Sequence, residues 1–280
     1  MLRTVALDHL RILAISGAER AAFLQGQLTQ DVASARTDAT ILAGWADAKG
    51  RLLFAGHLFA THLATGDALA LLVPAETAPD LLKRLRMYIL RAKAEATLLD
   101  IPVTGLVGEL TGPATTQPIR LFGAGIRHLC LGIYDATGES VERGTRDDWQ
   151  LDDIRAGLPT IVAATTGEFV PQMVNLDLQD GISFTKGCYT GQEIVARMKY
   201  RGRVKRRMLR FATAAEPPAA GTSLHAERGT VGQVVLSSRA ESGSEFLAVV
   251  VLDDLPGPLY LDEGRSQAVR QLDLPYDVPL

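Results

Sequence analysis

The sequence is poor in cysteine, with only Cys130 and Cys188 among its 280 residues. Two thiols allow one disulfide at most, and they cannot alone bind a four-thiolate metal ion or an iron–sulfur cluster. The five histidines are scattered and show no HxxxH or HExxH spacing. We therefore predict no metal site, and we expect a reduced, cytoplasmic protein.

Long apolar runs and a charge of one dominant sign are also missing. The longest apolar runs, 68–75 and 246–252, are far shorter than the roughly 18 residues that a membrane span needs. Asp8 and His9 interrupt the stretch where a signal peptide would be apolar. The net charge of -3 gives no overall attraction to nucleic acid or to a membrane. We expect no membrane contact, and any binding of polyanions must be local.

What remains is the composition of a soluble globular protein, 47% hydrophobic and 22% charged. Helices are predicted from a Ser16-x-x-Glu19 capping box, from Pro79 and from Asp147. Strands are predicted at 10–15, 41–46, 51–59, 69–73, 96–101 and 129–134. Because these elements alternate without regular βαβ spacing, we predict an α+β fold for residues 1–210.

The character of the chain changes after Arg210. A loop with Pro217 and Pro218 is followed only by strand-like pieces, at 232–237, 246–252 and 267–272. Residues 211–280 are therefore predicted to form a separate, small β-barrel.

The strongest functional signal is the segment 181–193, GISFTKGCYTGQE. We predict a strand at 182–184 and, from the Thr190-x-x-Glu193 capping box, a helix from Gly191. Cys188 would then lie just before a helix N-terminus, with Lys186 nearby, and both features favour a thiolate and lower a cysteine pKa. The alternative is a small, packed, inert thiol. Cys130, in the apolar stretch 129–131, is predicted to be buried and inert.

The second signal is a stretch of basic residues. Eight Lys or Arg residues lie between Arg197 and Arg210, and six of them occupy successive odd positions from 197 to 207. In an extended chain they would share one face and could bind an RNA backbone or the glutamate tail of a folate. The alternative is a solvated strand.

The third signal is Trp149, at the start of a short predicted helix. A tryptophan in this position packs in a core or forms the wall on which a flat heterocycle stacks. The sequence alone leaves both interpretations open.

Together these residues resemble the YgfZ family of folate-binding proteins. The resemblance rests on the signature Lys186–Glu193, followed by Val195, Ala196 and Arg197. It extends to ordered motifs at 23–29, 31–32, 47–50, 169–172, 175–176 and 181–184, and so covers most of residues 7–210.

The resemblance implies a fold like that of the glycine-cleavage T-protein, an aminomethyltransferase: two interleaved α+β domains and a C-terminal β-barrel around a folate channel. It also implies a tetrahydrofolate or related ligand, and a link to iron–sulfur enzymes such as those that thiolate tRNA. Trp149 matches a folate contact of the family, whereas Leu10 stands where a second aromatic contact is expected.

Further roles follow from the same resemblance. Cys188 would be the functional thiol, accepting a transferred group or ligating a cluster together with a partner's thiol, with Lys186 beside it. Tyr189, Gln192 and Glu193 would lie next to the ligand. Arg197 or its neighbours would face the glutamate tail.

Two rival functions remain. A tetrahydrofolate-dependent aminomethyltransferase or demethylase would need an acidic base in the strand after the first hairpin, but the stretch 56–63 has no carboxylate and the next is Asp67. A simple tRNA-binding module would rest on residues 197–210 alone.

Overall fold

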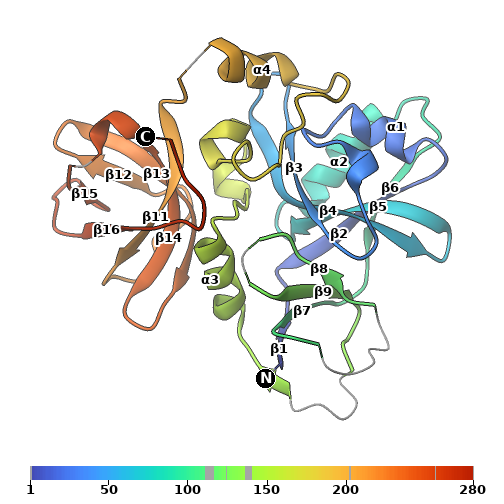
Figure 1. The fold of residues 1–280 in the computed structure, drawn as a ribbon, viewed down its shortest axis with the longest axis horizontal. Coiled ribbons are helices and arrows are strands. Elements are labelled where there is room, and N and C mark those ends of the chain that lie inside the picture. The colour runs from blue at the N-terminus through green and yellow to red at the C-terminus, as the bar shows by residue number, and fades with distance from the viewer. Residues whose placement is uncertain are drawn as a thin grey trace.

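A computed structural model describes residues 2–110, 117–123, 125–135, 141–201, 203–255 and 257–279. It has three β-structures, and the long helix α3 (Arg146–Ala156) runs between the C-terminal barrel and the two sheets (Figure 1). The predicted α+β fold and the closed C-terminal barrel are both confirmed.

The two sheets are interleaved along the chain. After β1 (Leu2–Ala6) in sheet A, the chain builds all of sheet B and then returns to sheet A. Sheet A has the order β10 (Val141–Arg143), β1, β7 (Val103–Val107), β9 (Arg127–Leu131), β8 (Ile119–Arg120). Sheet B has the order β3 (Ile41–Ala46), β4 (Leu52–Leu63), β5 (Gly66–Pro74), β2 (Leu10–Ser16), β6 (Glu95–Leu99).

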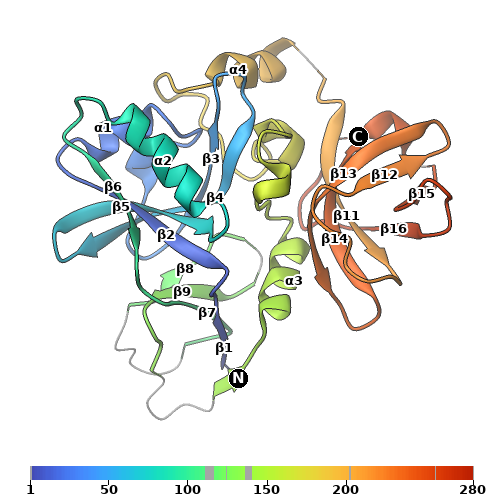
Figure 2. The ribbon, with the colours of Figure 1, turned by 180° about the vertical axis from the view of Figure 1, so that it is seen from behind.

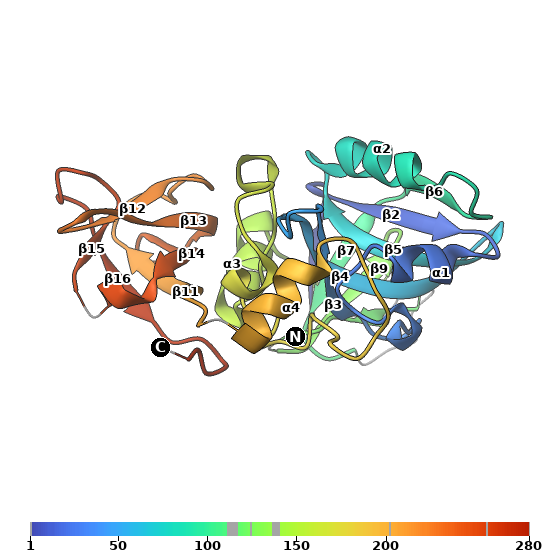
Figure 3. The ribbon, with the colours of Figure 1, turned by 90° about the horizontal axis from the view of Figure 1, so that it is seen from above.

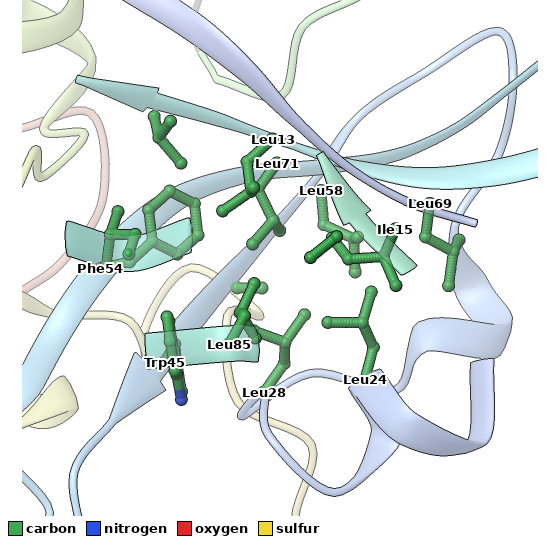
Figure 4. Close-up of a cluster of buried hydrophobic side chains, with 14 of the residues drawn as sticks. Leu13, Ile15, Leu24, Leu28, Trp45, Phe54, Leu58, Leu69, Leu71 and Leu85 are labelled. Carbon is green, nitrogen blue, oxygen red and sulfur yellow. The ribbon is translucent and has the colours of Figure 1, made fainter. Parts of the chain in front are cut away.

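Sheet B has a different environment on each face. Leu81 and Leu85 of α2 (Ala78–Tyr88) pack on one face together with residues of α1 (Arg20–Gln25), in the cluster drawn in Figure 4. Figure 2 shows α2 lying across this face. The opposite face carries Leu10, Leu42 and Leu72, and this face is turned toward α3.

The barrel has the strand order β11 (Arg206–Thr213), β14 (Ser244–Val251), β13 (Gly229–Arg239), β12 (Ser223–Ala226), β15 (Leu259–Tyr260), β16 (Ala268–Leu272). Its first strand begins at Arg206, inside the predicted first region. Seen from above, the barrel lies to one side of α3 (Figure 3). Short 3-10 helices lie at Val32–Ser34, Ala163–Thr165, Pro171–Val174 and Leu252–Asp254.

Two local predictions are wrong, each because a distant contact replaces the local one. Ser16 ends β2 and caps nothing: α1 begins at Arg20, and the Glu19 carboxylate accepts the Lys93 N–H at 2.6 Å. The segment 182–184 is not a strand. It is held by single hydrogen bonds instead, such as Ser183 N–H to the Thr29 carbonyl at 2.9 Å.

The basic stretch is also not one extended strand. Residues 192–201 form the helix α4 (Gln192–Arg201), which starts one residue later than predicted, and residues from Arg206 form β11. The odd-numbered basic residues therefore do not share one face.

Candidate functional site

A cavity of about 290 Å³ opens where sheet B, α3 and the barrel meet. Its size is at the lower end of the range for ligand pockets. Three separate parts of the chain form its walls: sheet B, α3 with the segment after it, and β13. The lining includes Leu10, Leu42, Ala55, His57, Leu72, Glu76, Arg146, Trp149, Gln150, Asp153, Leu158 and Leu236.

Trp149 lies on this wall and is also part of a core cluster. A capping box between Thr145 and Asp148 fixes the start of α3, which sets the direction of the Trp149 side chain. The ring packs so closely on Gly105 that a Cβ there would lie 2.3 Å from it, and only 2% of the tryptophan is exposed. The core interpretation is thus confirmed, and a small part of the residue also reaches the cavity, whereas stacking of a heterocycle on it stays a prediction. Leu10 lines the same cavity.

Polar groups in the wall come from residues that the sequence did not single out. Gln150 Nε2 donates to the Ser237 carbonyl of the barrel at 2.5 Å. Asp153 is paired with Arg127 at 2.7 Å, and Glu76 accepts the Ala163 N–H at 3.0 Å. The cavity can therefore offer acceptors to a ligand, but both carboxylates already have partners.

Two imidazoles line the cavity, and His57 of β4 is more buried than His9. His57 Nδ1 lies 2.9 Å from Thr40 Oγ1. Burial, and to a smaller degree the nearby Arg127, lowers the pKa of His57 to about 3. The ring is therefore neutral at physiological pH. No signal in the sequence marked this histidine, because its partners come from distant segments.

The predicted functional thiol lies elsewhere, since neither Cys188 nor its neighbours from Lys186 to Arg197 line the cavity. Cys188 is exposed and unpaired, whereas Cys130 is buried in β9 and burial raises its pKa to about 11. Among the described residues, no group of three His, Cys, Asp or Glu side chains could hold a metal ion.

Lys186 anchors the loop that presents Cys188. Its Nζ donates to the carbonyls of Gln25, Leu28 and Gln30 at 2.7, 2.6 and 3.1 Å. Burial lowers the pKa of Lys186 to about 8, with Asp31 opposing the change, so the ammonium is mostly charged near pH 7. Since three carbonyls take its three hydrogens, Lys186 fixes the loop to the end of α1.

The motifs that carry the family resemblance converge on the same loop. Gly191, with φ +81°, packs so close to the 47–50 turn that a Cβ would lie 2.5 Å from the Asp47 carbonyl oxygen. Thr190 N–H donates to the Gly26 carbonyl, and Thr29 Oγ1 donates to that of Gly181. The conformation at Cys188 is thus built by segments from both halves of the chain.

The remaining predicted residues surround this loop. Tyr189 is buried, its N–H donates to Gln192 Oε1 at 3.3 Å, and burial raises its phenol pKa to about 12. Glu193 and Arg197 are exposed on α4. The structure therefore brings Lys186, Tyr189 and Gln192 together next to the loop position of Cys188 in the sequence, and it brings Trp149 and Leu10 together in the cavity wall.

The basic residues 197–210 divide into two groups. Arg207 is buried and paired with Asp177 at 2.6 Å, and Arg210 is paired with Glu245 at 2.7 Å. Exposed basic side chains remain at Arg197, Lys199, Arg203, Lys205 and Arg206, which we call the α4 basic surface. The side chain of Arg201 lies outside the described residues.

In the part of the chain that the structure describes, no helix is long and apolar enough to cross a membrane.

Comparison with solved structures supports the predicted fold. The glycine cleavage system aminomethyltransferase T from Bartonella henselae superposes with a TM-score of 0.70, covering 97% of this chain and 84% of that one, at 15% identity. This likeness shows a T-protein fold.

Sequence comparison identifies relatives over nearly the whole chain. No protein-family model matches it. A protein of Vibrio vulnificus strain YJ016 named tRNA-modifying protein YgfZ is 32% identical over 97% of this chain and 91% of its own. The Sodalis glossinidius protein of the same name is 32% identical over 99% of this chain and 94% of its own. At this identity and coverage, the chain belongs to the YgfZ family.

Proposed function

We propose that this protein is a folate-binding accessory protein that supports iron–sulfur enzymes, including enzymes that thiolate tRNA. The observation that carries the proposal is the cavity between sheet B, α3 and the barrel. Its wall holds Trp149 and Leu10, the two positions that the family resemblance connects with folate. The relatives named tRNA-modifying protein add the link to tRNA.

The residues of the cavity fit a reduced folate. Apolar side chains such as Leu10, Leu42 and Leu72 can cover the faces of a pterin ring, and Trp149 adds an aromatic edge. Glu76 and Asp153 can accept hydrogen bonds from the amino and ring N–H groups. Arg146 is exposed, lines the cavity, and is better placed than Arg197 to meet the glutamate carboxylates.

Two sites follow from this arrangement. The cavity would bind folate, and the Cys188 loop would act at the surface, on a partner protein or a cluster that the partner shares. An exposed thiol on an anchored loop suits this role, because the partner must reach it.

The rival aminomethyltransferase would need a free carboxylate base in the cavity. The candidate strand supplies His57 instead, and Asp67 bonds to His62 at the far hairpin. Of the carboxylates in the cavity wall, Asp153 is held by Arg127 and Glu76 accepts the Ala163 N–H. These contacts favour the accessory role. The tRNA-binding alternative is carried by the α4 basic surface.

The test has two parts. Titration with 5-formyltetrahydrofolate should show saturable binding by the wild-type protein. In a strain that lacks the homologous gene, wild type should restore the activity of iron–sulfur enzymes and Cys188→Ala should not. Absence of folate binding, or full rescue by Cys188→Ala, would contradict the proposal.

A further inference from the structure

His57 is a neutral imidazole in the wall of the candidate folate cavity, in the very stretch where an aminomethyltransferase would need its acid. Leu42, its register partner in β3, lines the same cavity. What His57 can do there depends on which ring nitrogen carries the hydrogen.

The hydrogen bonds around Thr40 settle this point. Thr40 is buried, and its Oγ1 accepts the Phe122 N–H at 2.9 Å. If His57 Nδ1 also donated to Oγ1, the hydroxyl hydrogen would have no acceptor among the described residues, which is costly in a buried site. The hydroxyl therefore donates to Nδ1 at 2.9 Å, and the hydrogen of the neutral ring is on Nε2.

Nε2 is then the polar group of His57 that is left for a ligand. No described residue bonds to it, while His57 lines the cavity. A neutral Nε2–H donates and cannot accept, so this position favours a ligand acceptor and disfavours a ligand donor.

We propose that His57 selects the ligand of the cavity by donating from Nε2 to the C4 carbonyl oxygen of a bound pterin. The proposal rests on the proposed function. The C4 oxygen is the strongest acceptor of the pterin ring. The amino and N–H groups of the ring are donors, which match the carboxylates of Glu76 and Asp153 instead. As a donor without an accessible lone pair, His57 takes no proton from the ligand, and its role is recognition.

The first test uses the free protein. Long-range ¹H–¹⁵N NMR spectra distinguish the two tautomers of neutral histidine, and loss of one signal set in His57→Gln assigns His57. The inference requires a protonated Nε2 and an unprotonated Nδ1. The opposite pattern would overturn it whether or not folate binds.

The second test compares folic acid with aminopterin, which carries an amino group in place of the C4 oxygen. Wild type should bind folic acid at least about tenfold more tightly, the size expected for one hydrogen bond against an unpaired donor. His57→Leu should lose this preference. His57→Gln, whose amide can donate, should bind folic acid more tightly than His57→Leu does.

The outcomes separate the two proposals. A wild-type protein that binds both compounds equally, or a folded His57→Leu that keeps the preference, would overturn the role of His57 and leave folate binding intact. A wild-type protein that binds no folate would overturn the proposed function itself. Circular dichroism of each variant confirms that it is folded.

Discussion

At the scale of single residues, the two tryptophans form a natural pair of probes. Trp45 and Trp149 are almost fully buried, at 1% and 2% exposed, but only Trp149 lines the cavity. Trp149→Ala would cost about 3–5 kcal/mol of stability as a core truncation, which would obscure any loss of binding. Phenylalanine at each position preserves an aromatic side chain.

We therefore predict that folate quenches the fluorescence of Trp45→Phe, which retains Trp149, and quenches that of Trp149→Phe far less. Affinity should fall for Trp149→Phe only, while both variants lose some stability. Titration by fluorescence and by calorimetry measures both effects. Equal affinities in the two variants would leave Trp149 as a core residue.

His57 gives a pH prediction. The unfolded histidine binds a proton near its ordinary pKa of 6.5, whereas the folded one does so near 3. Between these values the unfolded chain holds more protons, so the free energy of unfolding falls as the pH falls. From neutral pH to about pH 4.5, this single histidine lowers the free energy of unfolding by about 3 kcal/mol.

His57→Gln should remove that part of the acid sensitivity. Urea unfolding of both proteins at the two pH values tests this, and the contribution of His9, whose pKa burial lowers to about 4, cancels in the comparison. Parallel losses of stability in wild type and variant would show that His57 protonates in the folded state.

The two cysteines should differ sharply in alkylation. Cys188 is exposed and should react in the native protein, whereas Cys130 is buried and burial raises its pKa to about 11. Mass spectrometry should find one label on native wild type and none on native Cys188→Ser. A native Cys188→Ser that labels at Cys130 would contradict the described burial.

The sequence anticipates part of the cavity wall at this scale. The family resemblance connects Trp149 and Leu10 with folate, and the structure places both in the wall. No local pattern points to His57, Gln150 or Arg146, because distant segments bring these residues to the cavity. Lys186 was expected beside the thiol, but three carbonyls from residues 25–30 take its hydrogens.

At the scale of elements, α4 shows why the prediction of one extended strand for the basic stretch is wrong. Alternating basic residues fit a strand, but residues 192–201 also form a good helix with Val195 buried. Arg207 and Arg210 then fall in β11, where each finds a carboxylate. Composition identified a basic segment, while only the packing decided which side chains stay free.

The α4 basic surface should bind polyanions. We predict that Arg197→Glu with Lys205→Glu weakens binding of tRNA and makes it less dependent on salt, at unchanged stability, because neither exposed side chain pairs with a described residue. Gel shifts across a salt series measure the effect. A matched control, Lys83→Glu with Arg84→Glu, changes the charge equally on exposed residues of α2. Equal effects of both pairs would mean that only net charge matters.

Arg207 is unsuitable for that test. It is buried against Asp177, so Arg207→Met would leave an unpaired carboxylate and cost about 3–5 kcal/mol.

At the scale of the whole molecule, the cavity forms where three parts of the fold meet: sheet B, α3 and the barrel. The sequence predicts most strands of sheet B, a helix at α3 and a C-terminal barrel, but their mutual placement depends on long-range contacts that no local pattern encodes. The C-terminal segment makes one of them. It leaves β16 and returns past β11 toward α3 (Figure 1), where Leu274 and Tyr276 pack on Gly157.

Tyr276 connects the barrel to the end of α3. Its hydroxyl donates to the Gly157 carbonyl at 3.0 Å and accepts from Gln179 Nε2 at 3.1 Å. Asn175 Nδ2 lies 3.4 Å from it and also donates to the Met208 carbonyl of β11. Gly157, at φ +68°, has no room for a side chain against this tyrosine.

We predict that Tyr276→Phe lowers the free energy of unfolding by about 1–2 kcal/mol, because Gln179 loses a buried acceptor. The same change should loosen α3 against the barrel. Amide exchange at Gly157 and Leu158 should therefore rise, and folate affinity should fall, since α3 carries Trp149 and Gln150. Tyr260→Phe in β15 is the control, because no described residue bonds to that hydroxyl. If the two variants match in stability, amide exchange and folate affinity, the C-terminal segment does not hold sheet B, α3 and the barrel together around the cavity.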